Sequence, residues 1–89
     1  HTITFDFMTT TLYNKEREVS LSEIEKKLLY VLAKNRNHFV PSSSIIEYVW
    51  ENDLIHTNTL RTTIKRLRSK IGDNAIVSSR TFGYKLIIQ

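Results

Sequence analysis

The chain has 89 residues, of which 13 are Lys or Arg and nine are Asp or Glu, so its formal net charge is +4. This length suffices for one small domain with a single hydrophobic core. There is no cysteine, which excludes disulfides and thiolate chemistry, and no apolar run approaches the roughly 20 residues that a membrane span needs.

The charge is unevenly divided along the chain. Residues 1–55 carry six basic and eight acidic side chains, a net charge of −2. Residues 56–89 carry seven basic side chains and one acidic side chain, a net charge of +6. This asymmetry predicts that the second part of the chain faces a polyanion.

The first 21 residues predict a small antiparallel sheet. Residues 2–7 alternate with a period of two, and residues 10–13 and 18–21 are rich in the side chains that favour strands.

A first helix is expected from Ser22 to about Asn35. Ser22 and Glu25 have the spacing of a capping box, in which each side chain accepts a hydrogen bond from the backbone of the other residue. The expected buried face consists of Ile24, Leu28, Val31 and Leu32.

Pro41 separates the first helix from the second, because the residue before a proline is pushed out of the helical region. A second helix is expected from about Ser43 to Trp50, with Ser42, Ser43 and Ser44 competing to cap it. A polar connector, Glu51–His56, leads to the third helix.

The segment Asn58–Ile71 predicts a helix with one apolar face and one basic face. No carboxylate lies between Asp53 and Asp73, so the cations of this helix have no partner within it. Thr57 or Asn58 is expected to cap it, and Gly72 to end it in a left-handed conformation. The apolar stripe is Leu60, Ile64, Leu67 and Ile71. A basic helix attached to a core by one edge is well suited to a nucleic-acid groove.

Two β-rich runs, residues 75–79 and 84–88, are joined by Arg80–Gly83 and predict a hairpin with a loop of four residues. The order of elements predicts an α+β fold, a winged helix-turn-helix with an N-terminal antiparallel sheet, three helices and a C-terminal β-hairpin wing. A single domain is expected over residues 1–89, with the sheet in 1–21, the three-helix core in 22–72 and the wing hairpin in 73–89.

Four groups of residues occur in a characteristic order and spacing. They are Leu21, Ser22, Glu25, Leu28 and Leu29; then Phe39, Val40, Ile45, Val49 and Trp50; then Leu60, Ile64, Arg66–Arg68, Lys70 and Ile71; and then Ile76, Arg80 and Gly83–Leu86. Together they resemble the OmpR/PhoB-type winged-helix DNA-binding effector domains of bacterial response regulators, over nearly the whole chain.

This resemblance implies sequence-specific binding to double-stranded DNA and transcription regulation in a cytoplasmic two-component system. It further implies that a phosphorylated receiver domain precedes this module, that two copies pair on neighbouring half-sites, and that the connector Glu51–His56 approaches RNA polymerase. Three positions depart from the family pattern. Pro41 replaces a usual serine cap, so the second helix is expected to begin one or two residues later; Arg61 adds a cation; and Thr81 replaces a glycine, which predicts another wing-turn geometry.

Ten residues are predicted to contact DNA: Trp50, Thr59, Thr62, Thr63, Lys65, Arg66, Arg68, Ser78, Arg80 and Tyr84. On a helical wheel the three threonines share one polar flank with Arg66, whereas Arg61, Lys65 and Arg68 lie toward the other. Arg66 is expected to read a base edge, because a guanidinium can bridge O6 and N7 of guanine. The threonines could touch thymine methyls or phosphates, and Lys65, Arg68 and Lys70 suit phosphates.

In the wing, the resemblance assigns Arg80 to an adjacent minor groove. Ser78 and Tyr84 could donate hydroxyl groups to phosphate, and Tyr84 is equally suited to packing against a strand. Trp50 is expected mainly in the core, and the resemblance suggests that its indole N–H also reaches a phosphate.

Two other functions stay open: a winged-helix module that binds proteins, and a non-specific nucleic-acid binder. An enzyme is the least favoured class, because no acid/base pair or nucleophile emerges from the sequence. The three histidines lack metal-ligand spacing, and no cofactor or membrane association is expected.

Overall fold

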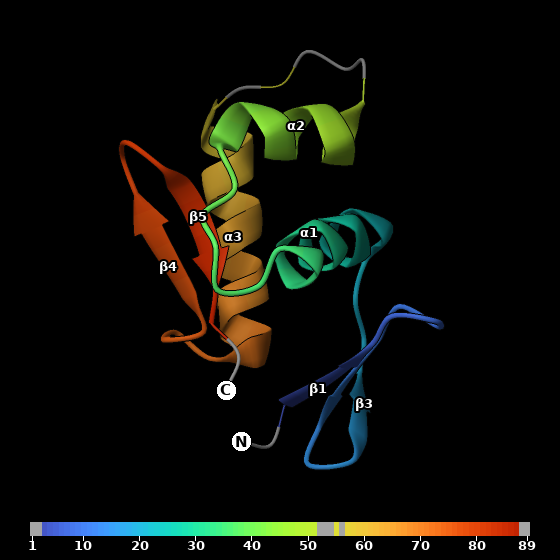
Figure 1. The fold of residues 1–89 in the computed structure, drawn as a ribbon. Coiled ribbons are helices and arrows are strands. Elements are labelled where there is room, and N and C mark those ends of the chain that lie inside the picture. The colour runs from blue at the N-terminus through green and yellow to red at the C-terminus, as the bar shows by residue number, and fades with distance from the viewer. Residues whose placement is uncertain (1–2, 52–54, 56, 88–89) are drawn as a thin grey trace.

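The structure is a computed structural model that describes residues 3–51, 55 and 57–87. Its elements are β1 (Ile3–Asp6), β2 (Thr11–Asn14), β3 (Arg17–Val19), α1 (Glu23–Lys34), α2 (Ser42–Trp50), α3 (Thr57–Ile71), β4 (Ile76–Ser79) and β5 (Gly83–Leu86). The β4–β5 hairpin stands beside α3, and the N-terminal sheet lies at one end of the molecule (Figure 1). The predicted α+β architecture, with three helices and two antiparallel sheets, is confirmed.

The N-terminal sheet has the order β1-β2-β3, and both strand pairs are antiparallel. Lys15 and Glu16 join β2 to β3 with φ of 53° and 69°, as a tight hairpin turn of two residues requires. Leu12 in β2 is 1% exposed and packs into the hydrophobic core. One face of this small sheet is therefore held against the helices.

The N-terminus of α1 carries the predicted capping box. The Ser22 hydroxyl accepts the backbone N–H of Glu25 at 3.1 Å, and the Glu25 carboxylate accepts the backbone N–H of Ser22 at 2.8 Å. The buried face includes Leu29 and Ala33 in addition to the predicted Leu28 and Leu32, whereas Ile24 and Val31 are only partly buried. The N-terminal sheet packs on one side of α1, and the other two helices pack on another side. The covered part of the α1 surface is therefore wider than a single helical stripe.

The second helix is present close to its expected start, but the expected serine cap was wrong. The helix begins at Ser42, one residue before the predicted Ser43, and no serine side chain caps it. Pro41 occupies the capping position with φ −59° and ψ 143°, and its carbonyl accepts the N–H of Ile45 at 3.1 Å. The three serines therefore lie inside the first turn. Proline suits this position because it adopts the extended conformation without bending the helix.

α3 begins at Thr57, so Thr57 and Asn58, which were expected to cap it, both lie inside the helix. Gly72 follows its last residue with φ 110°, and its N–H donates to the carbonyl of Arg68 at 2.7 Å. The left-handed ending predicted for the third helix is therefore present.

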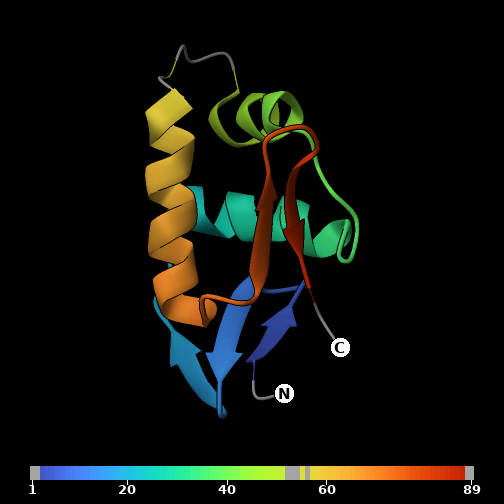
Figure 2. The same ribbon diagram turned by 90° about the vertical axis from the view of Figure 1, so that its left-hand side faces the viewer.

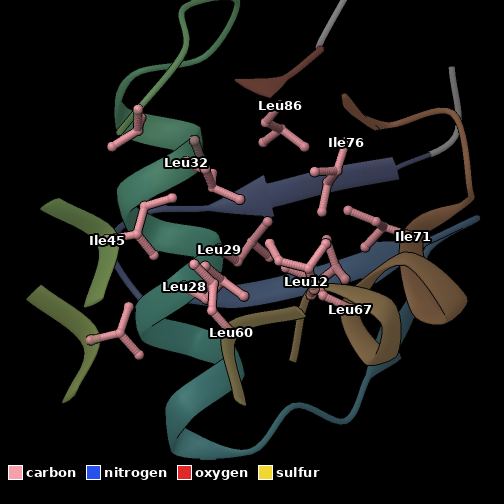
Figure 3. Packing of buried hydrophobic residues seen from close by; sticks show 14 of the residues in the cluster. Leu12, Leu28, Leu29, Leu32, Ile45, Leu60, Leu67, Ile71, Ile76 and Leu86 are labelled. Carbon is pink, nitrogen blue, oxygen red and sulfur yellow. The ribbon is translucent and has the colours of Figure 1, made fainter. Parts of the chain in front are cut away.

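The core gathers side chains from every helix and both sheets. The apolar stripe of α3 is buried as predicted, with Leu60 3%, Ile64 1%, Leu67 0% and Ile71 5% exposed. Figure 3 shows Leu67 and Ile71 beside Leu12 of the N-terminal sheet, with Ile76 and Leu86 of the hairpin nearby. The stripe fixes the rotation of α3 about its axis, so the opposite side of the helix faces outward.

The hairpin turn contains three residues, Arg80–Phe82, not four. Gly83 belongs to β5, where it pairs with Ser79. The Ser79 hydroxyl accepts the backbone N–H groups of Thr81 at 3.2 Å and Phe82 at 3.1 Å. This side-chain bond to the turn gives the wing a defined tip without the first glycine of the family pattern.

The edge of β5 that faces away from β4 pairs with the chain between α1 and α2. The N–H of Val40 donates to the carbonyl of Tyr84 at 2.7 Å, and the N–H of Tyr84 donates to the carbonyl of Val40 at 3.0 Å. The backbones approach closely here, because a Cβ on Gly83 would clash with the Val40 carbonyl oxygen and lie 2.9 Å from the Cα of Pro41. Gly83 is thus required for this approach as well as for its φ of 102°.

Candidate nucleic-acid interface

One face of the molecule presents α3 and the wing side by side (Figure 2). Between them lies an open groove of about 660 Å³. Arg61, Lys65 and Arg68 of α3 line one side, Ser78, Ser79, Arg80 and Tyr84 of the wing line the other, and Ser42 and Ile46 of α2 lie at the groove as well. The groove thus brings Arg80 of the wing together with cations of α3 that lie 12 to 19 residues earlier in the chain.

The other flank of α3 forms a second, smaller hollow of about 260 Å³. It is lined by Asn58, Thr59, Thr62, Thr63 and Arg66. The two flanks therefore have the members that the helical spacing predicts, with Arg66 on one side and Arg61 and Lys65 on the other.

The cations on this face are exposed to solvent. Arg61, Lys65, Arg66 and Arg80 are exposed, and no carboxylate within residues 3–51, 55 and 57–87 forms an ion pair with any of them. Unpaired cations on one rigid surface create a positive potential that attracts polyanions.

Two cations predicted to contact phosphates form hydrogen bonds within the protein. The Arg68 guanidinium donates to the backbone carbonyl of Ile76 through Nε at 3.2 Å and Nη2 at 2.9 Å. It therefore connects α3 to the first strand of the wing. It also lines the groove, so part of the side chain remains accessible.

Lys70 points away from this face. Its Nζ lies 2.6 Å from Oε1 of Glu25 and 2.9 Å from the carbonyl of Ser20. Burial alone would raise the pKa of the Glu25 carboxyl, but the hydrogen bonds and charge of Lys70, together with the bonds from Ser22, hold that pKa below its ordinary value of 4.5. The expectation that Lys70 contacts phosphate was wrong. Lys70 lies near the C-terminal end of α3, where the helix packs beside the start of α1, so its ammonium group meets the Glu25 carboxylate.

The threonines of the second hollow differ in accessibility. Thr62 is exposed and Thr59 is half-buried, whereas Thr63 is only 6% exposed. The Thr63 hydroxyl donates to the carbonyl of Thr59 at 2.7 Å, and the Thr62 hydroxyl donates to that of Asn58 at 2.9 Å. Burial and this hydrogen bond argue against a direct contact of Thr63 with a ligand, so the expectation for Thr63 is not supported.

In the wing, Ser78 and Arg80 are exposed and Tyr84 is half-buried, all three on the groove. Tyr84 also packs against the core, as its alternative interpretation predicted. Trp50 is 9% exposed and belongs to the core cluster. Its core role is therefore confirmed.

The sequence analysis missed several residues of this face. Ser42 and Ser79 line the groove, and Phe82 stands exposed at the wing tip. The position of Ser42 next to Pro41 indicates a helix cap and gives no sign of the groove. For Phe82, the sequence signal is its position at the tip of a short hairpin.

Within the described residues, no three His, Asp or Glu side chains come together as metal ligands could, and no helix there has the length and apolar character to cross a bilayer. Of the connector predicted to approach RNA polymerase, residues 52–54 and 56 lie outside the described part. Glu51 is exposed and its carboxylate lies 3.4 Å from Nζ of Lys27.

Comparisons with known proteins place this face in context. Residues 16–86 match the family described as "Transcriptional regulatory protein, C terminal". Response regulator ArlR of Staphylococcus epidermidis is 36% identical over 72 residues, which are 75% of this chain and 33% of that protein. The chain thus spans about a third of the length of the curated relatives it matches.

Solved structures agree in fold. Response regulator DrrB of Thermotoga maritima, an OmpR/PhoB homologue, superimposes with a TM-score of 0.89 at 25% identity, over 99% of this chain and 42% of that one. The DNA-binding domain of Klebsiella pneumoniae RstA, solved in complex with the RstA box, gives a TM-score of 0.83 at 22% identity, over 98% and 92%. With a family match over most of its length, the chain belongs to the C-terminal domains of transcriptional regulatory proteins of the OmpR/PhoB type.

Proposed function

We propose that this domain binds double-stranded DNA sequence-specifically and regulates transcription as the effector part of a response regulator. The observation that carries the proposal is the groove between α3 and the wing, whose exposed cations Arg61, Lys65 and Arg80 form no ion pair with a carboxylate in the described part of the chain. An exposed basic helix about 15 residues long fits a major groove, and a hairpin beside it reaches the neighbouring backbone or minor groove.

We assign the side chains of this face to different contacts with DNA. Arg66 reads a guanine edge, with Thr59 and Thr62 beside it on the same flank of α3. Arg61 and Lys65 contact phosphates across the groove from Ser78 and Tyr84. Arg80 at the wing tip reaches the minor groove.

The remaining steps concern the whole regulator. One module offers few base contacts, so two copies are proposed to pair on neighbouring half-sites, under the control of a receiver domain. The connector of residues 51–56 is proposed to contact RNA polymerase. The protein would then act in the cytoplasm, where bacterial DNA lies, and without catalysing a reaction.

Selection of binding sites from a random duplex pool, followed by a salt titration on the selected site, tests the proposal. With about six phosphate contacts, the logarithm of the affinity should fall against the logarithm of the salt concentration with a slope near −5. A flat response would favour the protein-binding function. Equal affinity for every duplex would favour the non-specific nucleic-acid binder.

Arg66→Ala should weaken binding to the selected site by about 1–3 kcal/mol and relax selectivity at one base pair. Arg17→Ala is the matched control, because Arg17 is an exposed cation in β3 and its removal changes the net charge equally. A uniform loss over all sequences with Arg66→Ala would make Arg66 a phosphate contact.

A further inference from the structure

Phe82 is a large apolar side chain in an unusual place. It lies in the three-residue turn at the wing tip and is 61% exposed. Neighbouring Arg80 is an exposed cation of the groove. The ring is therefore available to a partner that meets the wing tip, next to an exposed cation.

The ring has a defined position. Its centroid lies 5.8 Å from that of Phe39, at an interplanar angle of 35°. The Nζ of Lys85 sits 4.5 Å from the centroid of the same Phe39 ring. Phe39 is half-buried and adjoins Val40, whose backbone pairs with β5. Phe82 therefore rests on a partner that is itself fixed to the fold.

The turn that carries Phe82 is also fixed. The backbone N–H of Phe82 donates to the Ser79 hydroxyl at 3.1 Å. The next residue, Gly83, packs directly on the backbone of Val40 and Pro41. The ring is thus presented at the tip by a braced backbone.

The surroundings select the kind of partner. Arg80 in the turn is an exposed cation, and Lys85 in β5 holds its Nζ over the Phe39 ring, so an anionic partner that also covers an apolar ring fits the wing tip. The minor groove of duplex DNA meets both conditions, since phosphates line its edges while sugars and base edges form its walls and floor. Apolar side chains can partly unstack a base step from this groove.

We propose that Phe82 is a minor-groove wedge, an apolar side chain that presses between two base pairs beside the contact of Arg80. This inference rests on the proposed DNA binding and adds a determinant of specificity to it. Pyrimidine–purine steps, above all TA, unstack most easily, so the domain prefers such a step where the wing meets DNA. Phe82 favours a flexible step, whereas Arg80 favours a narrow minor groove. A-tracts provide a narrow groove without flexible steps.

The test uses the 89-residue chain and labelled duplexes that keep the selected α3 site. At the wing-facing position, about half a helical turn away, the duplexes carry a TA step, an AA step or a GC step. TA and AA have the same base composition, so their comparison excludes an effect of composition, and Arg80→Ala separates the preference for a flexible step from the preference for a narrow groove. Affinity is measured by fluorescence anisotropy at several salt concentrations, with thermal melting to check folding.

Wild type should bind the TA duplex on the order of tenfold more tightly than the AA duplex, which corresponds to about 1.4 kcal/mol. Phe82→Ala should abolish that preference and leave the salt slope unchanged, because the ring touches no phosphate. Arg80→Ala should instead keep the TA preference and lower the salt slope by about one. Met8→Ala is the control, since Met8 is 93% exposed but lies at the β1–β2 turn.

Phe82→Lys provides a second variant whose aliphatic stem still covers Phe39. It should lose the TA preference and steepen the salt slope by about one. A TA preference that survives in both Phe82 variants overturns the inference while leaving the proposed function intact. A wild-type chain that enriches no duplex from the random pool overturns the proposed function itself.

Discussion

The Nζ of Lys70 lies 2.6 Å from Oε1 of Glu25 and joins the C-terminal end of α3 to the first turn of α1. Glu25 is simultaneously the acidic member of the α1 capping box. A single carboxylate therefore completes the start of one helix and fixes the far end of the helix proposed to enter DNA.

Lys70→Met should lower the free energy of unfolding by about 1–2 kcal/mol. Removing one partner of a buried pair can cost 3–5 kcal/mol, but here the Lys70 side chain is 33% exposed and solvent screens part of the effect. Urea denaturation at neutral pH measures the change. Lys65→Met on the same helix is the control and should be nearly neutral, because Lys65 is exposed. Equal stability of the two variants would contradict a structural role for Lys70.

The stability of the domain should depend on pH through Glu25. Its folded-state pKa is lowered relative to 4.5, so the unfolded chain takes up a proton first as the pH falls. The stabilisation is fully present above the unfolded value and is lost as the pH falls through the folded value. Glu25→Gln should be less stable at pH 7, and its disadvantage should shrink toward pH 3. Denaturation curves across this range give the comparison, and a constant difference between wild type and variant would be inconsistent with the assignment.

Arg68→Ala should loosen the wing. The substitution leaves the carbonyl of the buried Ile76 without its charged donor, which costs about 1–3 kcal/mol of stability. Amide hydrogen exchange in β4 and β5 should quicken more than exchange in α1. Arg68→Lys retains the charge with a single donor and should restore part of the protection. A variant with unchanged exchange but a salt slope reduced by about one would return Arg68 to the role of a phosphate contact.

Gly72→Ala and Gly83→Ala should lower the stability of the domain by different amounts. Gly72→Ala meets no atom within 4 Å and suffers only from its φ of 110°, so a loss of about 1 kcal/mol is expected. Gly83→Ala adds a clash with the Val40 carbonyl, and a loss of about 2–5 kcal/mol is expected. Thermal melting compares the pair. Similar losses in both would show that the backbone at Gly83 shifts easily.

Features governed by local spacing were predictable from the sequence. The capping box depends on residues three positions apart, and the buried stripe of α3 depends on helical periodicity, so Ser22, Glu25 and Leu60 behave as predicted. The separation of Arg66 from Lys65 onto two flanks follows from the same periodicity.

Features governed by distant partners were not predictable. Lys70 meets a carboxylate 45 residues away, and Arg68 meets a backbone oxygen, which no side-chain pattern reveals. Phe82 rests on Phe39, 43 positions earlier, and only the fold brings the two rings together. One-dimensional patterns therefore identified the basic face, but they did not reveal the partners that Arg68 and Lys70 have within the protein.

The pairing of Val40 with Tyr84 has a consequence for the affinity of the wing for a partner. A two-stranded hairpin on its own is only marginally stable and would have to become ordered when it meets a partner. Here the hydrogen bonds to Val40 give it a third strand segment from the helical core. Its conformational entropy is lost during folding, so the wing is preorganised and complex formation incurs little further ordering cost.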